Sequence, residues 1–275
     1  MKKTILITGT SSGIGKETAR FFSLKNWNVI ATMRQPQEES ELAQLENVFI
    51  TKLDVQQPDT IATAIKTGIE KFGKIDALIN NAGYGQLGVF EAIGPEKVIR
   101  QFDVNVFGVM NTIREILPHF REVEAGLIIN ISSGAGRFSL PLNSVYCASK
   151  FAIEGFSEAL SFELSALNIG VKIIEPGGTS SNFIKVGQQH FPDKQIADYD
   201  KFQNAAFKMF AGMQGAKLAT PEEVAKTVYE AATDDTDKLR YVVGNEDFKS
   251  RMTARMSTPD ADYLITIKNG YKHFL

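Results

Sequence analysis

The chain has 275 residues, of which 43% are hydrophobic and 23% charged, and its formal net charge at pH 7 is −2. This balance is ordinary for a soluble globular protein and leaves no basic surplus for nucleic acid or an acidic membrane. The single cysteine, Cys147, excludes an internal disulfide framework and fits a reducing compartment. Because no apolar stretch approaches the length that crosses a bilayer, we expect a cytoplasmic protein without a membrane span.

Short apolar segments alternate with helix-like segments along the chain. Runs of strand length occur at residues 5–7, 29–31, 48–50, 75–79, 127–131, 171–174 and 241–243. Helical patterns fill intervals at about 14–24, 38–45, 59–72, 95–120 and 145–166. This order predicts an α/β fold with a doubly wound parallel sheet, a Rossmann-type three-layer sandwich. With no repeat or linker to divide the sequence, we predict one domain over residues 1–275.

A glycine-rich turn, Thr8-Gly9-Thr10-Ser11-Ser12-Gly13-Ile14-Gly15, joins the first predicted strand to the first predicted helix. Glycine permits backbone angles that other residues avoid and lets the main chain approach a pyrophosphate. The N-terminus of the next helix offers N–H groups and a partial positive charge to that anion. Such a turn can also be a purely structural corner, but its place after the first strand favours a dinucleotide site.

The tip of the second strand bears on which dinucleotide binds. An acidic residue about 20 residues beyond the glycines holds the ribose 2′-hydroxyl of NAD. Here Arg34 ends the strand, and the first carboxylate is Glu38. A guanidinium can bind a 2′-phosphate, although Arg34 could also be a solvated loop charge and Ser12 supplies no second cation before Gly13. The sequence favours NADP over NAD.

Tyr146 and Lys150 lie four residues apart in a segment with helical periodicity. On a helix they share a face, although an isolated pair of this kind usually marks a solvated surface. Ser133 follows the strand at 127–131, at the sheet edge where ligands bind. Together these side chains suit carbonyl reduction: Ser133 stabilises the developing oxyanion, Tyr146 supplies the proton, and Lys150 lowers the phenol pKa from about 10 towards neutrality.

The ordered motifs resemble those of the short-chain dehydrogenase/reductase family, in its compact single-domain branch. They are Thr8-Gly9-x-x-x-Gly13-x-Gly15, Asp54, Asn80-Asn81-Ala82-Gly83, Asn105, Ser133, Tyr146, Lys150 and Pro176-Gly177. The match covers most of the chain. Within the family, the chain looks most like the branch that handles steroid, retinol or other lipophilic carbonyl substrates.

The resemblance implies further roles. Asp54 and Val55 would contact the adenine, Asn105 would hold a bend and a proton-relaying water, and Thr179 or Ser181 would touch the carboxamide. The predicted cofactor-binding residues are Gly9, Ser11, Ser12, Gly13, Ile14, Gly15, Arg34, Asp54, Val55, Asn81, Ala82, Gly83, Tyr146, Lys150, Pro176, Gly177, Thr179 and Ser181. The predicted catalytic residues are Ser133, Tyr146, Lys150 and Asn105.

Residues 180–215 are rich in aromatic side chains and show no strand pattern. They could form a mobile lid over an apolar substrate, or simply complete the core or an oligomer contact. The three histidines lack metal-ligand spacing, so we expect no metal site. The family usually pairs the helices near 95–120 and 145–166 between subunits, which favours a homodimer or homotetramer.

The sequence therefore predicts an NADP-dependent oxidoreductase acting on a lipophilic ketone, aldehyde or secondary alcohol, with Tyr146 as general acid and base. A non-catalytic protein that senses the dinucleotide on the same fold is the alternative. Epimerisation of a sugar nucleotide uses a similar tyrosine and lysine, but the short segment after Val243 leaves little room for a nucleotide-sugar domain.

Overall fold

A computed structural model describes residues 2–180, 194–213 and 218–275 of the chain. Within these ranges the strands form one parallel sheet in the order β3-β2-β1-β4-β5-β6-β7. The strands are β1 (Thr4–Thr8), β2 (Asn28–Met33), β3 (Val48–Lys52), β4 (Ala77–Asn80), β5 (Gly126–Ile131), β6 (Ile169–Pro176) and β7 (Arg240–Val243). The strand order reverses between β1 and β4, which confirms the predicted doubly wound α/β fold.

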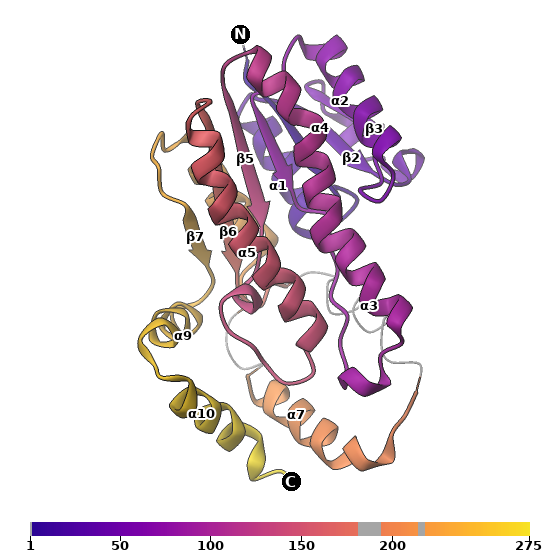
Figure 1. Ribbon diagram of the computed structural model, residues 1–275. Coiled ribbons are helices and arrows are strands. Elements are labelled where there is room, and N and C mark those ends of the chain that lie inside the picture. Colours follow the sequence, from indigo (N-terminus) through magenta and orange to yellow (C-terminus); the bar gives the residue numbers. More distant parts are fainter. Residues whose placement is uncertain (1, 181–193, 214–217) are drawn as a thin grey trace.

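Helices cover both faces of the sheet, and α4 and α5 lie side by side in front of it (Figure 1). One face packs against α2 (Pro58–Phe72), α4 (Gly108–Glu122) and α5 (Ser144–Ser165), and the other against α1 (Gly13–Leu24) and α8 (Pro221–Thr233). Successive strand residues point to opposite faces of the sheet. Leu6 therefore packs in the core beneath α2, α4 and α5, whereas Ile5 and Ile7 pack in the core beneath α1 and α8. Burial on both faces explains the continuous apolar runs in the sequence.

Among the described residues, four further helices lie beyond the carboxyl ends of the strands, below the sheet in Figure 1. They are α3 (Pro95–Phe102), α7 (Asp200–Met213), α9 (Glu246–Ser257) and α10 (Asp260–Lys272). Helix α10 packs on α7, where the rings of Phe202 and Tyr271 meet edge to face with centroids 5.4 Å apart. These helices lie near the edge of the sheet where a ligand is expected to bind. In the described ranges, no helix has the length and apolar character needed to cross a membrane.

The helix predicted at 38–45 is wrong. The segment forms two short 3₁₀ turns, Pro36–Glu38 and Leu42–Gln44. The Glu39 carboxylate accepts hydrogen bonds from the N–H groups of Glu41 (2.9 Å) and Leu42 (3.0 Å), and Lys16 of α1 pairs with Glu39 at 3.3 Å and with Glu41 at 3.1 Å. These side-chain contacts hold the segment against α1 and replace the backbone bonds of a helix.

Candidate active site

The turn between β1 and α1 is braced by the segment that follows β4. The Asn81 amide nitrogen donates to the carbonyl oxygens of Thr8 (2.9 Å) and Gly9 (3.0 Å). In return, the Thr8 hydroxyl accepts from the N–H groups of Asn81 and Ala82, both at 3.0 Å. Gly9 has a φ of 72°, a backbone angle that favours glycine. The motif after β4 therefore fixes the shape of the glycine turn.

The start of α1 has the properties of an anion site. Ser11 and Ser12 are exposed, and the Ser12 side chain does not cap the helix that begins at Gly13. A Cβ atom at Gly15 would collide with the Gly9 carbonyl oxygen and the Asn81 amide. Ile14 anchors the turn by packing against the core. Gly15 thus lets the start of α1 pack closely against the turn, and the first-turn N–H groups beside the exposed Ser11 and Ser12 fit a pyrophosphate.

Other predicted cofactor residues lie at the same edge of the sheet. Arg34 is exposed directly after β2, and the Asp54 carboxylate, after β3, accepts from the N–H group of Gln56 at 3.0 Å. Val55 is buried under α4, where it contacts Gly108. The edge therefore offers an exposed cation beyond β2 and a carboxylate and an apolar side chain beyond β3.

Pro176, the last residue of β6, is buried, and Gly177, which follows it, is half-buried. The Thr179 hydroxyl donates to the Gly177 carbonyl oxygen at 3.1 Å. A cavity of about 570 Å³ borders both Gly13 and Thr179, so the glycine turn and the segment after β6 open onto one space. Ser181, the other predicted carboxamide contact, lies outside the described residues.

Three of the four predicted catalytic side chains, Ser133, Tyr146 and Lys150, meet between β5 and α5. The Tyr146 hydroxyl hydrogen-bonds to the Ser133 hydroxyl, whose oxygen also accepts from the N–H group of Ala135 at 3.1 Å. One turn along α5, Lys150 is buried and its Nζ donates to the Ile131 carbonyl oxygen at 2.8 Å. The same Nζ lies 5.9 Å from the centroid of the Tyr146 ring. The spacing of the motif therefore does place phenol and ammonium together.

The electrostatics of the pair differ from the prediction. Burial raises the pKa of Tyr146 to about 12, although its hydrogen bond to Ser133 lowers it. Burial lowers the pKa of Lys150 to about 8, opposed by the negative charge of Glu154. The predicted lowering of the phenol pKa is thus wrong for this structure, because the ammonium is held at the Ile131 carbonyl and desolvation dominates.

Asn105 lies in a π-helical turn, Asp103–Phe107, between α3 and α4. Its amide nitrogen donates to the carbonyl oxygen of Tyr84 (2.9 Å) and to the Ser149 hydroxyl (3.3 Å), and its oxygen accepts from the Tyr84 N–H group at 3.1 Å. Gly83 leaves room for that oxygen, which would lie 3.2 Å from a Cβ atom there. Asn105 therefore links the loop after β4 to α5 at the residue next to Lys150, and π-helical turns often occur at functional sites.

Phe248 of α9 belongs to this region and was not predicted. Gly134, Gly177 and Gly244 follow β5, β6 and β7, and a Cβ atom at any of them would collide with the Phe248 ring. The ring therefore covers three neighbouring strand ends beside Ser133. A glycine just past each of three predicted strands was the signal that a bulky side chain approaches there.

A separate apolar cluster, here called the α7 cluster, lies beyond the strand ends. Its buried members are Val89, Ala92, Leu142 and Ala206, and Ile196, Tyr199, Phe202 and Phe210 pack against them. Phe183 and Phe191, also expected in this region, lie outside the described residues. Within the described ranges, no group of three or more His, Cys, Asp or Glu side chains could hold a metal ion.

Comparison with known proteins shows the family of the chain. Residues 3–190 match the family described as short chain dehydrogenase. The chain is 38% identical over 236 residues to an uncharacterized oxidoreductase of Schizosaccharomyces pombe, covering 85% of this chain and 97% of the relative. It is 31% identical over 256 residues to human retinol dehydrogenase 8, covering 86% and 80%. The solved structure of ElxO with NADP bound superposes with a TM-score of 0.72 at 28% identity, covering 88% of this chain and 98% of ElxO.

Proposed function

Because the chain belongs to the short-chain dehydrogenase family and is thus an NAD(P)-dependent oxidoreductase, we propose that it transfers a hydride between NADP(H) and a lipophilic ketone, aldehyde or secondary alcohol. Tyr146 acts as the general acid and base. The observation that carries the proposal is the hydrogen bond between Tyr146 and Ser133, with Lys150 one turn along the same buried helix face. A phenol, a hydroxyl and an ammonium converge at the sheet edge where such folds bind ligands.

The chemistry assigns one task to each side chain. Hydride addition places negative charge on the carbonyl oxygen, which Ser133 stabilises as Tyr146 donates its proton. Lowering the phenol pKa from about 12 to about 7 requires roughly 7 kcal/mol. At the 5.9 Å that separates Lys150 Nζ from the centroid of the Tyr146 ring, one ammonium supplies about 3 kcal/mol at an effective dielectric of 20, so Lys150 alone is insufficient. The nicotinamide supplies or accepts the hydride when bound, and its oxidised ring carries a second positive charge.

The preference for NADP rests on the charges beyond β2. Arg34 is exposed there, and no carboxylate lies between it and Glu38; Glu39 and Glu41, farther along, are paired with Lys16. The glycine turn, with Asn81 behind it, would hold the pyrophosphate, and Arg34 the 2′-phosphate. NADP in the similar ElxO structure supports this choice.

The lipophilic substrate is inferred from the α7 cluster. Its apolar and aromatic side chains pack together beyond the strand ends, and a hydrophobic substrate would bind beside such a cluster. The similarity to a retinol dehydrogenase supports the same class. We propose that residues 180–215 cover this substrate, with α7 as the described part of the cover.

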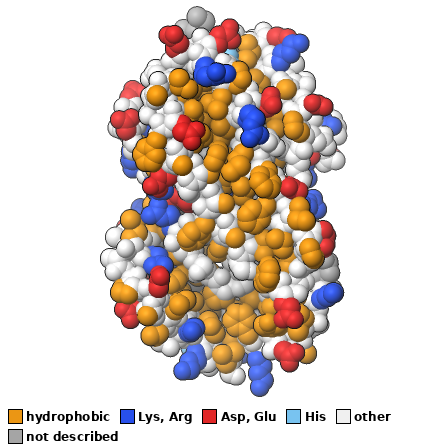
Figure 2. Space-filling view, viewed as in Figure 1, with side chains coloured by type: hydrophobic (Ala, Val, Ile, Leu, Met, Phe, Trp, Pro, Cys, Tyr) orange, Lys and Arg blue, Asp and Glu red, His pale blue; other side chains and the backbone are white. Residues whose placement is uncertain are grey.

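We also propose that the protein forms a homodimer or homotetramer through α4 and α5. Figure 2 shows hydrophobic side chains gathered along the face over these helices. Phe107 (51% exposed), Phe151 (47%) and Phe162 (73%) belong to α5 and to the turn before α4. Aromatic surface of this kind is more typical of an interface than of a solvated helix face.

The direct test is oxidation of NADPH in the presence of a panel of ketones and aldehydes, with NADP⁺ reduction by alcohols as the reverse reaction. We expect turnover with members that carry a large apolar group and little with short polar ones. Tight NADPH binding without turnover across a broad panel would instead indicate a dinucleotide sensor.

A further inference from the structure

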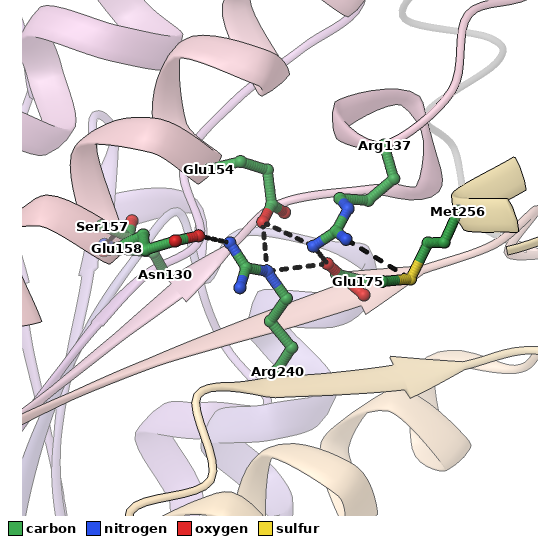
Figure 3. Close-up of polar contacts among 8 residues, drawn as sticks. All are labelled: Asn130, Arg137, Glu154, Ser157, Glu158, Glu175, Arg240 and Met256. Carbon is green, nitrogen blue, oxygen red and sulfur yellow. Dashed lines mark hydrogen bonds and ion pairs between the residues drawn. The ribbon is translucent and has the colours of Figure 1, made fainter. Parts of the chain in front are cut away.

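A cluster of charged side chains lies between α5, β6 and β7, and its Glu154 is one helix turn along α5 from Lys150. Figure 3 shows its members Arg137, Glu154, Glu158, Glu175 and Arg240. The Glu154 carboxylate of α5 accepts from Arg240 Nε at 3.0 Å and lies 3.9 Å from Arg137 Nη1. Glu175 of β6 lies 3.4 Å from Arg137 Nη1 and 3.5 Å from Arg240 Nε. Glu154 and Glu175 are 5% and 2% exposed, so these charges are almost withdrawn from water.

The cluster has more negative than positive charge. Arg240 also pairs with Glu158 at 2.5 Å, so two guanidiniums face three carboxylates, and the sum is one negative charge when all are ionised. One oxygen of Glu154 is buried without a hydrogen-bond partner. A buried, incompletely paired carboxylate is costly unless another cation compensates it.

The compensating cation is one helix turn away. Lys150 and Glu154 are at positions i and i+4 of α5, which share a helix face. The negative charge of Glu154 raises the pKa of Lys150 against the lowering caused by burial. Burial, followed by the charge of Glu154, raises the pKa of Glu175 to about 7, so the cluster becomes fully ionised in the range where Lys150 would begin to lose its proton.

The charged groups that face Glu154 come from every element packed around it. They are Arg137 from the loop after β5, Glu175 from β6, Arg240 from β7, and Lys150 and Glu158 from α5 itself. Helix α9 adds the uncharged Met256, whose sulfur accepts from Arg137 at 3.6 Å. Apart from Glu158, none of these carboxylates is on the surface.

We propose that Glu154 is a positioning residue of the active site: held between Arg137 and Arg240, its carboxylate keeps Lys150 protonated at and above neutral pH. Its role in catalysis rests on the proposed function, but its effect on Lys150 does not. Under the proposed function, Lys150 contributes part of the positive charge that the phenolate form of Tyr146 requires.

The test compares Glu154→Gln, which keeps the shape and removes the charge, with Glu158→Gln, which removes the exposed carboxylate from the same guanidinium. Urea unfolding is measured from pH 7 to pH 10 without ligand. Because burial lowers the pKa of Lys150, stability should rise with pH from about 8 in the parent protein. In Glu154→Gln this rise should begin about one pH unit lower, and in Glu158→Gln it should not move.

A double-mutant cycle isolates the cause. In a Lys150→Met background, Glu154→Gln should no longer change the pH dependence of stability between pH 8 and pH 10, a range above the pKa of about 7 at which Glu175 ionises. If Glu154→Gln does not fold, Arg240→Gln provides the opposite test, because loss of a cation should move the rise to higher pH. The proposal would be overturned if stability rose over the same pH range in Glu154→Gln as in the parent protein. It would also be overturned if Glu154→Gln moved that range equally in the Lys150→Met background, and the cluster would then be purely structural.

Activity then provides a second readout. The basic limb of the pH profile of kcat/KM for NADPH-dependent reduction should move in the same direction as the stability window in Glu154→Gln and remain in place in Glu158→Gln. Failure of the parent protein to turn over any substrate would count against the proposed function alone, since the unfolding experiment needs neither cofactor nor substrate.

Discussion

Lys150 Nζ donates a 2.8 Å hydrogen bond to the carbonyl oxygen of Ile131, the last residue of β5. This bond holds a buried ammonium beside the strand end that carries Ser133. Burial of the charge is nonetheless expensive, since it lowers the pKa of Lys150 from 10.5 to about 8. Burial of the Lys150 ammonium thus lowers the stability of the folded protein, and it places a positive charge in the site.

Lys150→Met should therefore make the protein more stable at pH 7 while abolishing its activity. The lowered pKa corresponds to about 3 kcal/mol of destabilisation below pH 8, and loss of the bond to Ile131 offsets about 1 kcal/mol. The variant should gain about 2 kcal/mol in the free energy of unfolding. This advantage should disappear as the pH rises from about 8 to 10.5, where the unfolded chain also loses the proton. Urea unfolding of Lys150→Met and the parent at pH 7 and pH 10 measures this difference in the free energy of unfolding. A variant that is less stable than the parent at pH 7 would contradict the prediction.

Arg34→Asp should weaken NADPH binding by roughly 10- to 100-fold, the worth of one charged hydrogen bond to phosphate. NADH, which lacks the 2′-phosphate, should bind with little change. Titration of the fluorescence of either cofactor measures both affinities. Lys66→Asp on α2 is the control for net charge, because Lys66 is exposed and forms only a 4.0 Å pair with Glu70. Equal losses for the two cofactors in Arg34→Asp would remove the assignment of NADP.

Phe162→Asp should convert the proposed oligomer to a chain of 30.3 kDa, because it places a charge in the most exposed aromatic position of α5. Phe90→Asp is the matched control: Phe90 is 63% exposed but belongs to the turn Phe90–Ala92 and not to α4 or α5. Light scattering of both variants and the parent measures the mass. A parent of 30.3 kDa at micromolar concentration would refute the proposed assembly.

The strands and the site motifs were predictable because their signals are local. A run such as Ile5-Leu6-Ile7 is apolar on both faces, and the spacing of Tyr146 and Lys150 is fixed by one helix turn. The conformation of the segment at 38–45 was not predictable, because it depends on the ion pair between Glu39 and Lys16 of α1. The predicted direction of the pKa shift of Tyr146 was wrong for a related reason, because desolvation depends on all the groups packed around the ring.

The charged cluster around Glu154 was also invisible in the sequence. Arg137, Glu154, Glu175 and Arg240 come from four different elements, and the longest separation between paired members, Glu154 and Arg240, is 86 residues. Only the strand order, which places β7 beside β6, brings Arg240 to the site. Local patterns cannot report such tertiary pairings.

The measurement that tests the account most directly is the rate of NADPH oxidation by Tyr146→Phe with the best substrate of the panel. Tyr146→Phe removes the hydroxyl bonded to Ser133 and little else, so the rate should fall by roughly 10²- to 10⁴-fold while the dissociation constant for NADPH stays within about twofold. A variant that retains near-normal turnover with intact NADPH binding would show that this phenol is not the proton donor.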